Sequence, residues 1–141
     1  MHNSEEILLS KEQLLAAPEQ DYMNDQQLAF FKQMLIALHQ STLARIQEAK
    51  AQMTQPHDLS DESDIASWHE QSNLALRIVD REQKLLPKIK EALERIRLGT
   101  FGYCEESGEP IGIPRLLARP TAEYGADVKK IKEIKEDHYR H

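Results

Sequence analysis

The 141-residue sequence contains a single cysteine, Cys104, so it cannot form an internal disulfide, and one isolated thiol fits a reducing cytoplasm. The sequence also lacks any run of about 18 apolar residues, which is the length that a membrane-spanning helix needs. The first six residues have neither the basic start nor the apolar stretch of a signal peptide. These absences predict a cytoplasmic protein that does not engage a membrane.

The sequence also lacks a net positive charge and has few glycines. The formal net charge is −6, which argues against direct DNA binding, because affinity for the phosphate backbone depends on clustered Lys and Arg. Five glycines beside 30% charged residues favour long solvated helices over a compact β fold. The sequence offers no nucleophile–base set, phosphate-binding loop or metal-ligand cluster, so we expect a protein partner and no enzymatic activity.

Apolar and small residues recur every three or four positions in the first half of the chain, as on one face of a helix. Asn24, with Gln27 three residues later, is a variant of the capping box that marks a helix start. The stripe consists of Leu28, Phe31, Leu35, Leu38, Thr42, Ile46, Ala49 and Met53. No Pro or Gly interrupts the segment before Pro56, so about 30 residues of helix would extend for roughly 45 Å.

A polar, acidic turn at residues 56–64 precedes a second stripe, and Ser60 or Asp61 can cap the helix that follows. This stripe consists of Ile65, Trp68, Ser72, Ala75, Val79, Glu82, Leu86, Ile89, Leu93 and Ile96. Its spacing alternates between three and four, which is a coiled-coil pattern, so the two helices must run antiparallel across the short turn. Inside this pattern Pro87 predicts a kink near residues 83–87, with a break as the alternative.

The flanking segments are shorter and less regular. The first of them contains a brief apolar patch before Pro18, and the last contains most of the glycines before a final helix from about residue 126 to residue 138. The predicted fold is mainly α, with an N-terminal arm (1–23), an antiparallel coiled-coil hairpin (24–98, tip at 56–64), and a small globular head with a C-terminal helix (99–141).

Two segments of the head carry a resemblance to a known family. Residues 101–112 read Phe-Gly-Tyr-Cys-Glu-Glu-Ser-Gly-Glu-Pro-Ile-Gly, and residues 115–122 contain Arg-Leu followed by Ala-Arg-Pro-Thr-Ala. Tyr22-Met23-Asn24 and Asp80-Arg81-Glu82 agree with the same pattern. Over about residues 22–138, these motifs and the order of hairpin and head resemble the DksA/TraR family, whose members regulate bacterial transcription through RNA polymerase.

The resemblance places the four zinc ligands of the family on Cys104, Ser107, Gly125 and Val128. Only Cys104 offers a thiolate, whereas structural zinc takes four Cys or His donors. The chain therefore resembles the zinc-free members of the family, with a degenerate zinc-finger-like head, no bound metal and a packed Cys104 thiol. Packing must then hold the head, and the candidate cluster comprises Phe101, Tyr103, Ile111, Ile113, Leu116, Leu117, Tyr124 and Ile131.

The resemblance also implies which residues contact the polymerase. The family carries an Asp-x-x-Asp-x-Ala pattern at the hairpin tip, which enters the secondary channel of the enzyme, and Asp61, Asp64 and Ala66 match it. Helix capping is the alternative role for the two acids. Arg77 and Arg81 match positions near the polymerase contact, although a solvated helix face with intrahelical ion pairs would also account for them.

Lys88, Arg119 and Lys129 match family positions that help to form a site for guanosine tetraphosphate (ppGpp) at the polymerase interface. Two lysine point charges and one bidentate arginine suit such a polyanion. The resemblance thus implies a monomeric, zinc-independent regulator that binds bacterial RNA polymerase and alters open-complex stability together with the effector ppGpp. A transcript-cleavage-stimulating factor and a generic coiled-coil adaptor are the alternatives.

Overall fold

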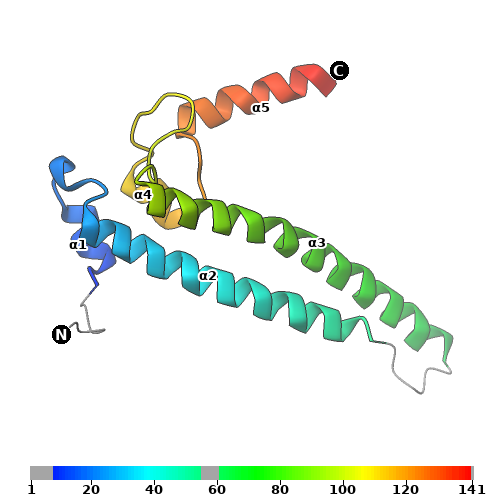
Figure 1. The fold of residues 1–141 in the computed structure, drawn as a ribbon. Coiled ribbons are helices and arrows are strands. Elements are labelled where there is room, and N and C mark those ends of the chain that lie inside the picture. Colours follow the sequence, from blue (N-terminus) through cyan, green and yellow to red (C-terminus); the bar gives the residue numbers. More distant parts are fainter. Residues whose placement is uncertain (1–7, 55–60, 141) are drawn as a thin grey trace. The chain divides into compact units, whose positions relative to one another are not determined.

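The computed structural model describes residues 8–54 and 61–140, which are mainly helical (Figure 1). The elements are α1 (Lys11–Ala16), the 3-10 helix η1 (Glu19–Asp21), α2 (Asp25–Gln52), α3 (Glu62–Leu98), α4 (Ile113–Ala118) and α5 (Ala126–Arg140). Within these residues, β pairing is limited to an isolated antiparallel bridge between Tyr103 and Pro110. The predicted mainly α class is confirmed. None of the helices described has both the length and the apolar character required to cross a membrane.

The two long helices begin where the sequence indicates. Asn24 Oδ1 accepts a hydrogen bond from the Gln27 backbone N–H at 2.9 Å, which caps α2. The Gln27 side chain reaches one residue further back than in an ordinary capping box, because its Oε1 accepts from the Met23 N–H at 2.9 Å. At α3, Asp61 Oδ1 accepts from the Ser63 N–H at 3.2 Å. The predicted caps at Asn24 and Asp61 are therefore confirmed.

The chain divides into two compact units. The hairpin unit comprises Ile36–Lys90, and the head unit comprises Met1–Leu35 together with Glu91–His141. Both long helices contribute to both units, so the first turns of α2 and the last turns of α3 pack with the head.

In the hairpin unit, α2 and α3 pack side by side along the two predicted stripes (Figure 1). The buried cluster consists of Ile46, Ala49, Ala75 and Val79, with Met53, Ile78 and Leu86 packed against it. Arg45 of α2 pairs with Glu82 of α3, whereas later residues of α2 pack with earlier residues of α3, so the helices are antiparallel. The predicted hairpin is confirmed in this unit, although Ile65, assigned to the stripe, is exposed.

Pro87 does not break α3, which continues from Glu62 to Leu98. Proline has no N–H, so the Gln83 carbonyl loses its helical partner. Both Gln83 and Pro87 are exposed, and water can satisfy the carbonyl there. The alternative of a helix break is therefore wrong, and the kink stays a prediction.

The head unit has its own core, built around two phenylalanines. Phe31 of α2 and Phe101, which follows α3, are fully buried, with their ring centroids 5.5 Å apart. Other buried apolar side chains of this unit are Leu14, Leu35, Ala92, Cys104, Ile111, Leu116 and Ala122. Of the predicted cluster, Phe101, Ile111 and Leu116 are buried, but Ile131 is 54% exposed. Its assignment to the core is wrong, because α5 is joined to the loops of the head through Lys132 rather than through this side chain.

Candidate functional site

The acidic residues at the start of α3 combine a cap with an exposed charge. Asp61 accepts from the Ser63 N–H, and its backbone carbonyl accepts from Ile65 N at 3.0 Å. Asp64 and Ala66 follow in the first turns of the helix, and all three predicted tip residues are exposed. Residues 56–60 of the predicted tip lie outside the described residues. Asp61 thus has the capping role that we considered, whereas the Asp64 carboxylate remains open to solvent.

Arg77 and Arg81 lie one turn apart on the exposed face of α3. The Arg81 guanidinium is 3.6 Å from the Glu82 carboxylate and its side chain is 72% exposed, so this pair is weak. Asp80, the acid that lies between the two arginines in the sequence, pairs instead with Lys84 at 3.1 Å. Both arginine side chains are therefore accessible to a partner.

The three residues of the predicted ppGpp site belong to different elements. Lys88 is exposed on α3 in the hairpin unit. Arg119 follows α4 and is exposed, and Lys129 is half-buried in the first turn of α5, with both residues in the head unit. The convergence of Lys88 with the other two remains a prediction.

The predicted zinc-ligand positions contain one thiol and no complete ligand set. Cys104 is 3% exposed, which confirms a packed thiol, while Ser107 offers only a hydroxyl and Gly125 and Val128 offer no ligating side chain. Among the side chains that the structure describes (residues 8–54 and 61–136), no three His, Cys, Asp or Glu residues are placed to hold a metal ion. The residues present do not fit a structural zinc, which requires four nitrogen or sulfur donors.

The pKa of the Cys104 thiol is affected by its neighbours Ser107, Gly125 and Glu106. Burial raises the pKa of this thiol, but hydrogen bonds from the Ser107 side chain and from the backbone N–H groups of Ser107, Gly125 and Glu106 outweigh burial and lower the pKa to about 7. These hydrogen bonds therefore favour the thiolate form of Cys104.

Ionic contacts connect the two segments of the head that contain the zinc-ligand positions. Glu105 N donates to Glu123 O at 2.9 Å. The guanidinium of Arg95, from the last turn of α3, lies 3.6 Å from the Glu105 carboxylate and 3.8 Å from the Glu123 carboxylate. The Arg95 side chain is only 12% exposed, so solvent screens these attractions weakly.

Two more cations act on the same segments. Lys132 of α5 pairs with Glu106 at 2.7 Å and lies 4.6 Å from the ring centroid of Tyr124, while Arg115 of α4 donates Nε–H to the Tyr124 carbonyl at 3.0 Å. We call Arg95, Arg115 and Lys132 the cation clamp. We did not predict it from the sequence, from which we expected side-chain packing to hold the head. The available signal was the acidic pair Glu105 and Glu106 beside Cys104, which favours cationic neighbours.

Tyr22 joins the start of α2 to the loop of the head. Its hydroxyl donates to the Gly102 carbonyl at 2.5 Å and accepts from the Gly112 N–H at 2.9 Å. Its ring packs edge-on against Tyr103, with centroids 5.5 Å apart. Burial is the main reason why the pKa of this phenol is raised. The Tyr22-Met23-Asn24 motif thus has a structural role in the head unit.

Comparison with known proteins covers almost the whole chain. Residues 27–96 match the family model described as "DnaK suppressor protein DksA, N-terminal domain". Residues 99–129 match the model described as "Prokaryotic dksA/traR C4-type zinc finger", although this chain lacks three of the four cysteines.

Curated relatives and a solved structure agree with these matches. The chain is 39% identical over 137 residues to the "RNA polymerase-binding transcription factor DksA" of Caulobacter vibrioides, with 95% of each chain covered. It is 39% identical over 120 residues to the protein of that name from Escherichia coli K12, with 84% of this chain and 80% of the relative covered. Its structure resembles that of "transcription factor DksA2 from Pseudomonas aeruginosa", with a TM-score of 0.77, 43% identity, and 94% and 100% coverage.

Proposed function

The chain belongs to the DksA family, and we propose that it is a transcription regulator that binds bacterial RNA polymerase directly. The observation that carries the proposal is the acidic start of α3, where the pattern Asp61-x-x-Asp64-x-Ala66 is exposed in a chain 39% identical to proteins named for polymerase binding. In this proposal the hairpin tip enters the secondary channel of the polymerase, and Arg77 and Arg81, further along α3, also contact the enzyme.

The proposed mechanism is electrostatic. Asp61 is occupied as a cap, whereas the Asp64 carboxylate is exposed one turn later and is free to act on groups near the polymerase active site. Two carboxylates are too few to hold Mg²⁺ by themselves, so the acids act on protein donors or on the field around a bound ion. The regulator thereby changes the stability of the promoter open complex.

The effector in this proposal is ppGpp, bound between this protein and the polymerase. Lys88, Arg119 and Lys129 supply two point charges and one bidentate donor for the phosphate oxygens. Lys129 lies at the positive end of the α5 dipole, an unfavourable place for a cation unless an anion binds there. The polymerase provides the remainder of the site, so the isolated protein binds ppGpp weakly.

The first experiment tests partner and mechanism together. Core polymerase should capture the protein, and a known secondary-channel binder should displace it. Asp64→Asn should bind polymerase normally, unfold within about 0.5 kcal/mol of the wild type, and lose regulation at a responsive promoter. Glu70→Gln, at another exposed acid of α3, is the matched control and should regulate normally.

Three results would overturn these assignments. Absence of capture by polymerase would leave a generic coiled-coil adaptor, and normal regulation by Asp64→Asn would reduce the tip acids to caps. Cleavage of the transcript in a stalled complex would identify a cleavage-stimulating factor.

The effector site has its own test. Lys129→Ala should remove only the response to ppGpp, whereas Lys130→Ala, at the neighbouring exposed lysine, should keep that response. Equal responses to ppGpp in the two variants would refute the site.

Zinc independence is part of the proposed function and has its own test. A structural zinc contributes about 10 kcal/mol or more to folding, so its removal would be obvious. Thermal unfolding should superimpose with and without a strong chelator, because the ligand set is incomplete. A lower midpoint in chelator, or one equivalent of zinc by elemental analysis, would contradict the proposal.

A further inference from the structure

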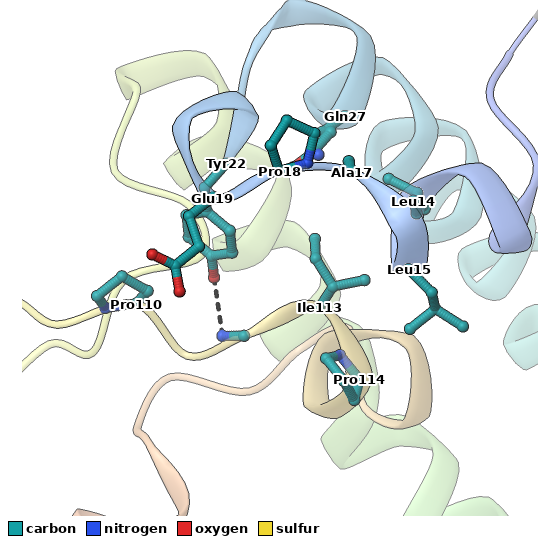
Figure 2. A pocket seen from close by; sticks show the side chains of 11 residues that line it. Leu14, Leu15, Ala17, Pro18, Glu19, Tyr22, Gln27, Pro110, Ile113 and Pro114 are labelled. Atoms are coloured by element: carbon teal, nitrogen blue, oxygen red, sulfur yellow. Dashed lines mark hydrogen bonds between the residues drawn. The ribbon is translucent and has the colours of Figure 1, made fainter.

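A groove of about 540 Å³ lies in the head unit between α1, η1 and the segment that leads into α4 (Figure 2). Its volume falls within the range of pockets that bind small molecules and peptide side chains. Leu14 forms a buried wall, while Leu15 is 55% exposed beside the opening. None of the residues assigned to the proposed polymerase or ppGpp contacts lines this groove.

The walls of the groove are held in place by hydrogen bonds. Tyr22, one of the lining residues, bonds through its hydroxyl to both Gly102 and Gly112. Helix α1 contributes Leu14 and Leu15 to the lining. Its start is fixed by a capping box between Ser10 and Gln13. A preformed groove requires little ordering when a ligand enters, which lowers the entropic cost of binding.

The lining determines which ligands are compatible. Three prolines line the groove, Pro18, Pro110 and Pro114, and none of them can donate a backbone hydrogen bond. The Gly112 N–H already donates to Tyr22. Four of the eleven lining positions thus offer no free backbone donor, which disfavours a phosphate or an added β-strand and favours recognition through side chains.

Glu19 is the charged residue among those that line the groove, and it has no ion-pair partner within the described parts of the chain. Figure 2 shows Glu19 and Pro110 toward one end of the groove and Leu15 and Pro114 toward the other. An occupant that complements this arrangement carries a cation at one end and an apolar group at the other.

We propose that this groove binds a short segment of a partner protein in which a lysine or arginine lies a few residues from a large apolar side chain. The cation pairs with the Glu19 carboxylate, and the apolar side chain packs on Leu14, Leu15 and Ile113. A peptide with a cation and an apolar side chain matches this arrangement of the lining. Because no proposed polymerase contact lines the groove, the interaction does not depend on binding to the polymerase.

The test titrates the full chain with blocked hexapeptides and follows the methyl signals of Leu14, Leu15 and Ile113 by NMR. The probes are a peptide with one Arg and two Leu, and matched peptides with Ser or Glu in place of Arg. The Arg peptide should bind about tenfold more tightly than the Glu peptide, which corresponds to about 1.4 kcal/mol. Glu19→Lys should reverse this order, and Leu15→Ser should weaken both peptides.

Glu48→Lys is the matched control, because it makes the same charge change at an exposed site of the hairpin unit and should leave the order intact. Equal binding of the Arg and Glu peptides, no saturable shift at millimolar peptide, or an unchanged order in Glu19→Lys would overturn the proposal. Tight binding of hexylamine would identify a small-amine site instead. Self-association that the Arg peptide reverses would identify a second copy of the chain as the occupant.

Discussion

Gly102 illustrates how the absence of one side chain permits a close contact in the head unit. Its φ is +91°, and a Cβ atom added there would lie 2.8 Å from Met23 Cγ and 2.9 Å from Met23 Sδ. Since Tyr22 also bonds to the Gly102 carbonyl, the start of α2 rests directly on this glycine. Both the backbone conformation and the space exclude a larger residue.

Gly102→Ala should therefore lower the free energy of unfolding by roughly 2–4 kcal/mol, from strain at positive φ together with overpacking against Met23. Gly108→Ala is the matched control. Gly108 has a φ of +74° but no atom within 4 Å of an added Cβ, so only the strain of about 1–2 kcal/mol should remain. Urea unfolding measures both, and equal losses would show that Met23 moves aside freely.

The Cys104 thiol predicts a specific dependence of stability on pH. Its pKa is lowered from 9.0 to about 7 in the folded chain, so the unfolded chain binds more protons between these values. Stability should rise from pH 7 to pH 9 and should lose this contribution as the pH falls through about 7.

Cys104→Ser removes the titrating group and is the reference for this measurement. The stability of the wild type relative to this variant should increase between pH 7 and 9, by at most about 2.7 kcal/mol for a difference of two pKa units. Urea unfolding at pH 6.5, 8 and 9 measures the difference. A constant difference across this range would mean that the Ser107, Gly125 and Glu106 hydrogen bonds do not stabilise the thiolate.

At the scale of the helices, one polar layer interrupts the apolar seam of the hairpin unit. Glu82 of α3 is buried, and its carboxylate accepts from Arg45 Nε at 2.8 Å and from Arg45 Nη2 at 3.4 Å. Arg45 Nη2 also donates to Thr42 Oγ1 at 3.2 Å, and that hydroxyl donates to the Leu38 carbonyl at 2.7 Å. Both Glu82 carboxylate oxygens and the Thr42 hydroxyl thus have partners, as a buried polar network requires.

Arg45→Met should destabilise the hairpin unit by about 2–3 kcal/mol, because it leaves the Glu82 carboxylate buried without its partner. The double variant Arg45→Met/Glu82→Leu should recover most of this loss. Arg81→Met is the control, since the exposed Arg81 approaches the same carboxylate only to 3.6 Å and should contribute less than about 0.5 kcal/mol. Urea unfolding of the wild type and the three variants tests this, and a double variant no more stable than Arg45→Met would contradict the coupling.

The sequence predicts the helices better than it predicts the contacts between them. The three-and-four spacing along both stripes and the caps at Asn24 and Asp61 are local signals, and they locate α2 and α3 correctly. Ile65 and Ile131 were misassigned because the same periodicity does not reveal whether another element covers a side chain. The cation clamp brings together residues as distant as Arg95 and Lys132, and local patterns carry no such information. The incomplete zinc set, by contrast, follows from residue types alone.

At the scale of the whole molecule, ionic contacts join the two segments of the head that carry the predicted zinc-ligand positions. Arg95 contacts Glu105 and Glu123, one from each segment that carries the predicted zinc-ligand positions. The pKa of Glu123 is raised chiefly by burial, and the neighbouring Glu105 adds to this effect, while Arg95 opposes it. The Arg95 guanidinium therefore offsets the repulsion between the partly buried carboxylates of Glu105 and Glu123.

Arg95→Met should keep the apolar stem of the side chain and remove its charge, so that Glu105 and Glu123 repel one another. We expect a loss of roughly 2 kcal/mol in stability and faster hydrogen exchange at the Glu105 amide, which bonds to Glu123. Arg97→Met is the control, because Arg97 is exposed and pairs only with Glu94 on its own helix among the described residues. Unchanged exchange at Glu105 would mean that the head is held without Arg95.

The polar layer of Arg45 and Glu82 also fixes the position of Asp64 along the hairpin. Asp64 precedes Glu82 by 18 residues in an uninterrupted helix, which is about 27 Å at 1.5 Å per residue. A slip of α3 by one heptad would again place apolar residues opposite apolar residues, but it would shift Asp64 along α2 by about 10 Å and separate Arg45 from Glu82. A seven-residue deletion between Asp64 and Glu82 would likewise preserve the stripe and shorten the reach of the carboxylate by the same distance. The Arg45–Glu82 ion pair thus fixes how far along the hairpin the Asp64 carboxylate extends, and this matters more than its contribution to thermal stability.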